Sequence, residues 1–451
     1  MNRVVVAAPC SGSGKTTVAT GLMRALRRHR VRVAPFKVGP DYVDPGYHAL
    51  AAGRPGRNLD PVLVGEDRIA PLFAYGSHAA DVAVVEGVMG LFDGRVDTEH
   101  GFGSTAHVAG LLAAPVLLVI DARGQGRSLA ALLHGFRGYD ATVRVAGVVL
   151  NQVGSARHEE VLRSACAEAG LEVFGVLHRE PDLQVPSRHL GLVTAAEHGA
   201  AAERAVETMA DAVVAGVDLE AVLNLAADTA PLSVRPWSPT DEVAPPVGRA
   251  HPVVAVAGGP AFTFGYAEHA ELLAAAGAEV AVFDPLSDRT LPEGAAGVLL
   301  PGGFPEDHAA ELSANAALRA EIGRLAHAGR PVHAECGGLL FLLRELDGLP
   351  MCGVLDATAG MTDRLTLGYR EAVATVESSL YPIGARVTGH EFHRTVVVPR
   401  SGAAPAWRWR DFDGTAVAEG FVTGGVHASY LHTHPAGAPL SVRGFVERCM
   451  S

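Results

Sequence analysis

The sequence predicts an α/β protein with two domains, each built on a parallel sheet, and two features carry this prediction. Short runs of β-branched and other apolar residues alternate with Ala- and Leu-rich stretches along the chain. Continuous apolar runs separated by helices are typical of parallel strands covered on both faces. A proline-rich break divides these runs into two sets. With 451 residues, 48% of them hydrophobic, the chain is long enough for roughly two or three domains with sizeable cores.

The break lies at residues 226–252, where six prolines occur without apolar periodicity. Proline at this density favours an extended connection, so we expect a linker at 226–250 between domains at 1–225 and 251–440. A long internal loop is the alternative. The predicted strands are 4–8, 31–37, 82–86, 116–121 and 145–151 before the linker, and 253–257, 279–283, 297–301 and 331–335 after it. Ligands of such folds bind where the parallel strands end.

Charge and cysteine content exclude several classes of protein. The net charge of −12 is the opposite of the basic footprint of nucleic-acid binders. The five cysteines are odd in number, scattered and without a CxxC pair, which predicts neither a disulfide framework nor a zinc site. The longest apolar run, 111–120, is about half of the ~20 residues that cross a membrane. We therefore expect a soluble cytoplasmic protein without nucleic-acid or membrane partners.

The first predicted strand leads into a loop that is typical of phosphate binding. Its small residues let backbone N–H groups surround a phosphate, and the helix that follows adds positive potential at its N-terminus. A lysine in this place reaches the β- and γ-phosphates of a nucleotide, and the hydroxyl after it holds Mg²⁺. Pro9 stands where the strict P-loop pattern has glycine, so the match is to the GKTT core alone. The candidate ATP-binding residues are Gly12, Ser13, Gly14, Lys15, Thr16 and Thr17.

Charged residues also follow the second and third predicted strands. Lys15 and Lys37 are the only lysines among 37 basic residues, which indicates that both places need a compact ammonium group. Asp44, Glu86 and Asp93 come just after strands, and an acid that closes an apolar strand beside a phosphate loop binds the metal or its water. Each acid taken singly could instead cap a helix or a turn. Together they favour metal binding and substrate positioning.

Cys336 has the sequence surroundings of a nucleophile. It lies where a predicted strand meets a helix, with Ala334 two residues before it and Gly338 two residues after it, as the crowded turn of a nucleophile elbow requires. The helix N-terminus is expected to lower the pKa of the thiol. Gly303 and Gly337 are candidate donors of an oxyanion hole. The alternative is a buried structural cysteine.

A base for this thiol is expected in the histidine-rich segments 389–393 and 427–434. Clustered histidines could instead form a metal site, although no regularly spaced carboxylate or thiolate ligands accompany them. If 428–434 form one strand, His432 and His434 share a face while His427 points away.

These motifs, taken in order, resemble the cobyrinic/hydrogenobyrinic acid a,c-diamide synthases. The resemblance extends from Cys10 to His434 and rests on GSGKTT, KVGPDYVDP, EGVMGLFDG, PGGFPE, ECGGLLFL, GHEFH and ASYLHTH. It implies that 1–225 form an ATP- and tetrapyrrole-binding amide ligase domain with a P-loop NTPase-like, dethiobiotin synthetase-like fold. It also implies that 251–440 form a class I glutamine amidotransferase domain with a flavodoxin-like fold.

The resemblance also implies roles for single residues. Cys336 would release ammonia from glutamine with His432 as its base, while ATP and Mg²⁺ activate a ring carboxylate as an acyl phosphate. Thr16 and Glu86 would serve the metal. Many such amidotransferases carry glutamate two residues after the histidine. His434 stands there instead, so we expect a Cys336–His432 dyad. Substrate binding and phosphoryl transfer would involve Lys37, Tyr42, Asp44 and Asp93.

Two other functions remain open at this point. One is the same amidation on another tetrapyrrole, such as nickel-sirohydrochlorin. The other is a non-catalytic ATPase switch with a degenerate amidotransferase tail, against which the intact elbow at Cys336 argues. Arginine and alanine in place of lysine indicate a GC-rich genome, which favours the metal-free hydrogenobyrinate over cobyrinate. ATP, glutamine and a tetrapyrrole are the expected partners, and a homodimer is left open.

Overall fold

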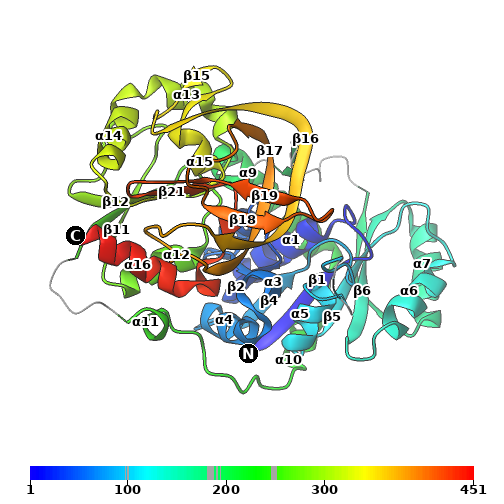
Figure 1. Ribbon diagram of the computed structural model, residues 1–451. Coiled ribbons are helices and arrows are strands. Elements are labelled where there is room, and N and C mark those ends of the chain that lie inside the picture. The colour runs from blue at the N-terminus through cyan, green and yellow to red at the C-terminus, as the bar shows by residue number, and fades with distance from the viewer. Residues whose placement is uncertain (97, 99–100, 180–186, 189–190, 193, 245–250) are drawn as a thin grey trace. The chain divides into compact units, whose positions relative to one another are not determined.

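The computed structural model of the chain describes all residues except 97, 99–100, 180–186, 189–190, 193 and 245–250 (Figure 1). The chain forms two compact units, Met1–Trp237 and Ser238–Ser451, whose boundary falls inside the predicted linker. The linker is not extended throughout. Helix α10 (Leu219–Ala227) ends within it, helix α11 (Pro239–Glu242) occupies part of it, and its last residues, 245–250, lie outside the described residues.

The first unit contains a seven-stranded sheet in the order β3-β2-β4-β1-β5-β6-β7, and all its paired strands are parallel. The predicted strands are present to within a few residues, because their side chains are almost entirely buried. The short β3 and the more exposed β7 were not predicted. The strands are β1 (Asn2–Ala7), β2 (Val33–Val38), β3 (Arg57–Leu59), β4 (Val82–Glu86), β5 (Val116–Asp121), β6 (Val145–Val153) and β7 (Glu172–His178).

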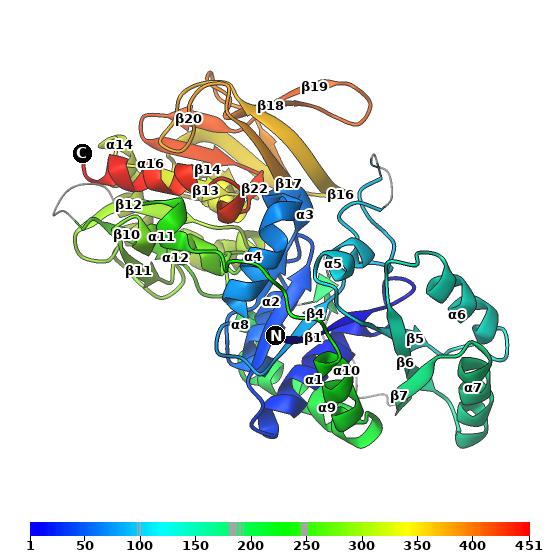
Figure 2. The same ribbon diagram turned by 90° about the horizontal axis from the view of Figure 1, so that it is seen from below.

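Helices connect these strands. Figure 2 shows α1 and α9 side by side, and Arg24 of α1 binds Glu203 and Glu207 of α9. A small antiparallel pair, β8 (Ser187–Arg188) and β9 (Gly191–Leu192), precedes the last helices of the unit. The other helices are α1 (Lys15–Arg28), α2 (Asp44–Ala52), α3 (Pro61–Val64), α4 (Glu66–Gly76), α5 (Thr105–Leu111), α6 (Leu129–Gly138), α7 (Ala156–Glu168), α8 (Ala195–His198) and α9 (Ala200–Gly216).

The second unit contains a six-stranded sheet in the order β11-β10-β12-β13-β21-β20. Its first five strands are parallel and, numbered along the chain, follow the order 2-1-3-4-5 of flavodoxin-like folds. Only β20 is antiparallel to its neighbour. The predicted fold class is confirmed for this sheet. The strands are β10 (Val253–Ala257), β11 (Glu279–Phe283), β12 (Ala295–Leu300), β13 (Val332–Glu335), β20 (Phe421–Thr423) and β21 (Val426–Ser429).

A second, mostly antiparallel sheet in this unit was not predicted. Its long strands β16 (Leu355–Ala374) and β17 (Arg386–Val398) pair side by side (yellow and orange in Figure 1). The middle of β16 is exposed or half-buried, and buried side chains alternate only near its two ends, so it lacks the continuous apolar run that marks parallel strands. The other strands are β14 (Leu343–Leu346), β15 (Leu349–Pro350), β18 (Trp407–Arg410), β19 (Ala416–Glu419) and β22 (His432–Thr433).

The last helix, α16, packs against β12 of the parallel sheet, where the buried side chains of Phe445 and Cys449 lie next to Gly297. The second unit therefore continues past residue 440, where the domain was expected to end. Its other helical segments are α12 (Ala267–Ala275), η1 (Pro305–His308), α13 (Ala309–Ala314), α14 (Ala316–His327), α15 (Gly337–Leu342) and η2 (Pro435–Gly437), with α16 at Pro439–Cys449. Among the described residues, no helix combines the length and the apolar character needed to cross a lipid bilayer.

Candidate active sites

The phosphate loop joins β1 to α1, as the sequence predicts. Gly14, just before the helix, has a φ of 95°, in the left-handed region that favours glycine. A side chain there would also clash with Asn151, whose Nδ2 donates to the Ser13 carbonyl oxygen at 3.0 Å. Asn151 follows the apolar run of β6 and fixes the loop from the neighbouring strand. Sequence reasoning missed it, although its place at the end of a predicted strand was a usable signal.

Lys15 is the first residue of α1 and is largely buried. Its ammonium group donates to the carbonyl oxygens of Met89, at 2.6 Å, and Cys10, at 3.3 Å. Burial, aided by Lys37, lowers the pKa of Lys15. Ser13 Oγ donates to the same Cys10 carbonyl at 2.9 Å. The Lys15 ammonium group is therefore held by two backbone carbonyl oxygens, one in the phosphate loop and one in the turn after β4.

A buried ionic network lies beside this loop. Lys37 Nζ is 2.6 Å from Asp44 Oδ2 and 2.9 Å from Glu86 Oε1, and Thr16 Oγ1 donates to the same Glu86 oxygen at 2.7 Å. Burial opposes the charge of Lys37, but the two carboxylates outweigh it and raise its pKa. For Glu86, Lys37 and His48 outweigh burial and lower the pKa. Four predicted site residues thus meet at the carboxyl edge of the sheet.

His48 belongs to this network and was missed from the sequence. Its Nε2 lies 2.6 Å from Glu86 Oε2, and its side chain is fully buried. His48 follows Asp44 by four residues on α2, a spacing that places both on one helix face. This spacing was the signal that could have found it.

Tyr42 and Asp93, the other two predicted substrate residues, have different surroundings. Tyr42 is buried just before α2. Asp93 is exposed, and its Oδ2 accepts a hydrogen bond from Gly90 N at 2.8 Å within its own turn. This turn lies against the phosphate loop, because Leu91 N donates to the Ala8 carbonyl oxygen at 2.8 Å. Asp93 therefore lies in an exposed turn beside the phosphate loop, whereas Asp44 and Glu86 are buried acids.

The donor set suits a magnesium ion that a nucleotide carries. Mg²⁺ takes one or two protein oxygens and completes its shell with phosphate and water. Thr16, at the start of α1, provides such an oxygen, and Glu86 accepts a hydrogen bond from its hydroxyl group. Within the described chain, no group of three or more His, Cys, Asp or Glu side chains is arranged to hold a metal by itself.

Cys336 occupies a sharp turn between β13 and α15. Its φ of 47° is unusual for a side-chain-bearing residue, and its N–H donates to the Ser429 carbonyl oxygen at 2.7 Å. A side chain at Gly338 would clash with Leu300. This clash explains why the elbow pattern requires a small residue at this position. A Cβ at Gly337 would lie only 2.9 Å from Gly303 N. The two predicted oxyanion glycines are therefore neighbours beside the thiol.

The expected low pKa of Cys336 is wrong for this structure. The thiol is buried, and burial together with the Glu306 carboxylate raises its pKa well above the ordinary value. The following helix, α15, has only six residues and cannot offset these effects. The thiol is therefore neutral at rest and needs a base.

His432 lies against the loop that borders the Cys336 elbow. It is fully buried on β22, and a side chain at Gly302 would clash with its ring. Because Gly302 precedes the oxyanion residue Gly303, the loop after β12 joins His432 to the Cys336 elbow. Burial lowers the pKa of His432 to about 4, so its imidazole is neutral and able to accept a proton.

The expectation of one strand over 428–434 is wrong. Residues 426–429 belong to β21 of the parallel sheet, and 432–433 belong to β22 of the antiparallel sheet. Buried Glu419 causes the break, because it accepts hydrogen bonds from Ser429 Oγ at 2.6 Å and from Tyr430 N at 2.9 Å. His434 lies past β22, where its Nδ1 accepts from Ala436 N at 3.2 Å and caps η2.

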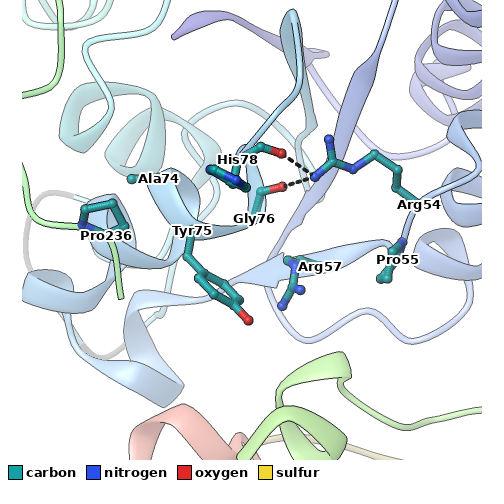
Figure 3. A pocket seen from close by; sticks show the side chains of 8 residues that line it. All are labelled: Arg54, Pro55, Arg57, Ala74, Tyr75, Gly76, His78 and Pro236. Carbon is teal, nitrogen blue, oxygen red and sulfur yellow. Dashed lines mark hydrogen bonds between the residues drawn. The ribbon is translucent and has the colours of Figure 1, made fainter. Parts of the chain in front are cut away.

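A cavity of about 430 Å³ lies elsewhere in the first unit (Figure 3). Arg54 crosses it and donates to the carbonyl oxygens of Gly76, at 3.2 Å, and His78, at 2.7 Å. Arg57 lies over the Tyr75 ring, 5.1 Å from its centroid. Arg57 begins β3, so the cavity lies at the amino edge of the sheet, opposite the phosphate loop. These contacts give both arginines a structural role.

Comparisons with known proteins agree with this two-part arrangement. The family model described as CobQ/CobB/MinD/ParA nucleotide binding domain matches residues 4–193, and the CobB/CobQ-like glutamine amidotransferase domain matches 253–439. A hydrogenobyrinate a,c-diamide synthase of Mycobacterium tuberculosis is 60% identical over 99% of this chain and 97% of its own. One of Streptomyces coelicolor is 56% identical with the same coverage. A cobyrinate a,c-diamide synthase of a Synechococcus species is 40% identical over 99% of this chain and 98% of its own. The chain belongs to the family of hydrogenobyrinate and cobyrinate a,c-diamide synthases.

Proposed function

We propose that this protein amidates the a- and c-acetate carboxylates of hydrogenobyrinic acid in cobalamin biosynthesis, using ATP and ammonia from glutamine. The observation that carries the proposal is that each unit holds one half of this chemistry. A cysteine elbow with a neutral histidine base lies in the second unit, and a phosphate loop with a buried lysine lies in the first. Full-length relatives that bear this activity in their names support it.

In the proposed glutaminase reaction, Cys336 Sγ attacks the side-chain amide carbon of glutamine while His432 takes the thiol proton. The backbone N–H groups of Gly303 and Gly337 stabilise the negative charge that develops on the amide oxygen. Collapse of this intermediate passes the proton to the leaving nitrogen, releases ammonia and leaves a thioester on Cys336. Water then hydrolyses the thioester to glutamate and restores the thiol. A neutral base beside a neutral thiol suits the first step, because the proton moves as the carbon–sulfur bond forms.

In the proposed ligase reaction, a ring carboxylate oxygen attacks the γ-phosphorus of ATP, and ADP leaves. Ammonia then attacks the acyl phosphate carbon, and phosphate leaves as the amide forms. The loop Gly12–Thr17 would hold the phosphates through its backbone N–H groups, with the Lys15 ammonium group beside them. Bound Mg²⁺ would neutralise charge on the phosphates, held by Thr16 Oγ1. Both Glu86 oxygens already face protein donors, so Glu86 would act through Thr16 or a metal-bound water.

The remaining charged residues would position the substrate. Lys37 holds Asp44 and Glu86 in place, so loss of this lysine would leave two buried acids facing each other. Tyr42 precedes α2 and Asp93 lies in the turn beside the phosphate loop, and both would contact the ring carboxylate or the transferred phosphate. In this assignment the region 1–225 is the ligase domain and 251–440 holds the glutaminase site.

The choice of ring rests on the pattern of relatives. Relatives named for hydrogenobyrinate include ones that are 51–60% identical to this chain, and relatives named for cobyrinate include ones that are 40–43% identical. The test is to incubate the purified protein with each ring, ATP, Mg²⁺ and glutamine, and to detect the amide products by mass spectrometry. Two added amides on hydrogenobyrinic acid at the highest kcat/KM support the proposal. Amidation of nickel-sirohydrochlorin alone, or ATP hydrolysis without glutamine hydrolysis, would replace it with one of the alternatives.

We propose that the enzyme acts in the cytoplasm. All five cysteines are free thiols, which suits the reducing cytoplasm. We propose a homodimer as the assembly of this enzyme, and sedimentation equilibrium of the full chain tests it.

A further inference from the structure

We infer that Glu335 is the positioning residue that orients His432, in place of the carboxylate that is missing at position 434. This inference rests on the proposed glutaminase site and adds a third member to its Cys336–His432 pair. The carboxylate comes from the residue directly before the nucleophile, not from the segment after the base.

Glu335 is held rigidly against the strand that carries His432. It is the last residue of β13, and its side chain is 5% exposed. Its Oε1 accepts hydrogen bonds from both Thr433 N, at 3.1 Å, and Thr433 Oγ1, at 2.8 Å. Because Thr433 directly follows His432, these two bonds fix the carboxylate next to the imidazole.

The second oxygen of this carboxylate faces the base. Glu335 Oε2 lies 3.9 Å from His432 Nδ1. This distance is longer than a hydrogen bond, but catalytic hydrogen bonds are often long before the substrate is bound and shorten in the reacting complex. A carboxylate at Nδ1 selects the tautomer that keeps Nε2 available to take the thiol proton.

The charge of Glu335 suits this task. Burial opposes ionisation, but His333, 3.3 Å from Oε1, and the nearby histidines lower the pKa of Glu335 to about 2. The carboxylate is therefore ionised whenever the enzyme works. It can stabilise the imidazolium that forms when His432 accepts the proton of Cys336.

Other charged groups lie around His432, and among the carboxylates Glu391 acts on its pKa less than Glu335 does. From β17, Glu391 is paired with Arg370 at 2.7 Å, and His390 and His393 carry no negative charge. His434 caps η2 through Nδ1, and its Nε2 lies 4.0 Å from Glu268. Glu306 acts on the thiol, whose pKa it raises. Glu335 is thus the carboxylate whose geometry is directed at the base.

Glu335→Gln tests this role, because glutamine keeps the shape and the Thr433 contacts but removes the charge. We expect kcat for glutamine hydrolysis to fall by up to about 10⁴-fold, the loss seen when a triad loses its carboxylate, with little change in KM. Ammonium-dependent amidation should stay within about twofold of wild type. Glu335→Asp should recover part of the lost rate. The matched control is Glu268→Gln, a buried acid of the same unit that faces His434, and it should retain full glutaminase activity.

A second measurement separates orientation from direct repulsion of the thiol. Alkylation of Cys336 by iodoacetamide is followed across pH in wild type, Glu335→Gln, His432→Ala and the double variant. If Glu335 acts through His432, Glu335→Gln raises the apparent pKa of the thiol, and this effect vanishes in the His432→Ala background. If it acts on the thiol directly, the same change lowers that pKa in both backgrounds, which overturns the inference. Because alkylation needs neither ring nor ATP, failure of the ring assay leaves this test intact.

Discussion

His48 and Glu86 meet inside the first unit, with His48 Nε2 2.6 Å from Glu86 Oε2 and neither side chain exposed. The other oxygen of Glu86 is bound by Thr16 and Lys37. The carboxylate is therefore held from both sides, and its orientation sets that of the Thr16 hydroxyl. His48 thus influences the phosphate loop without touching it.

His48→Ala should lower the ligase rate at least about tenfold with either glutamine or ammonium, because Glu86 loses the partner that orients it. A buried charge that loses a partner also costs on the order of 1–3 kcal/mol of stability. The required Mg²⁺ concentration should rise, since Thr16 is held less well. Rates measured against Mg²⁺ concentration check this, and the exposed His134→Ala on α6 is the control. Equal loss of glutaminase activity would mean that the variant has unfolded instead.

Lys15→Ala should reduce amidation on the order of 10²–10³-fold with either nitrogen source, because it removes a charge that stabilises phosphoryl transfer. Lys15→Arg should recover little, because the planar guanidinium does not fit a place shaped for a compact ammonium group. Glutamine hydrolysis, measured as glutamate released without ATP, should remain. If Lys15→Ala keeps full amidation with ammonium, the phosphate loop does not take part in the reaction.

Sequence patterns predicted the parts of this protein that depend on local rules. Strands such as β1, β2, β4 and β5 have nearly continuous buried side chains, so their apolar runs reveal them, whereas the edge strand β11 is largely exposed or half-buried. The elbow at Cys336 was predictable because Ala334 and Gly338 meet a steric requirement within two residues. The phosphate loop was predictable for the same reason, because Lys15 follows a predicted strand within a few residues.

The features that escaped prediction depend on contacts between distant segments. Glu335 lies in the ECGG motif, Asn151 ends a predicted strand and His48 follows Asp44 by four residues, but their partners lie far away in the sequence and are not visible in these patterns. The strand expected over 428–434 failed for the same reason, because Glu419 captures Ser429 and Tyr430 and bends the chain between two sheets. A periodicity rule sees His432 and His434 as equivalent, whereas this bend separates them.

Cys336→Ala should abolish glutamine-dependent amidation and keep ammonium-dependent amidation, because the thiol serves only the release of ammonia. The comparison is made at saturating ATP and ring, with glutamine or a high concentration of ammonium chloride. Cys352→Ala, a second cysteine of the same unit, should keep both activities. A Cys336→Ala protein that ammonium cannot rescue, yet melts like wild type, would contradict the division of labour between the units.

His432→Ala and His434→Ala should differ in kind. The first removes the base and should eliminate glutamine hydrolysis while sparing use of ammonium. The second removes the cap of η2 and a ring packed 4.2 Å from that of Tyr266, so it should lower the melting temperature but change kcat little. Glutamate release and calorimetry on both variants separate these effects. Loss of kcat in His434→Ala alone would exchange the two assignments.

Glu419 should make the second unit less stable as pH rises. Burial raises the pKa of its carboxyl to about 8, from an ordinary value of 4.5 that applies once the chain unfolds. Between these values the folded state binds more protons than the unfolded state, so stability is full below about pH 4.5 and falls toward pH 8, by up to about 1.4 kcal/mol per pH unit. Glu419→Gln keeps a neutral side chain that can still contact Ser429 and Tyr430, so it should flatten this slope. Calorimetric melting between pH 5 and 8 measures it, with the exposed Glu377→Gln as control. A slope in Glu419→Gln as steep as that of wild type would show that the buried carboxyl does not cause the pH dependence.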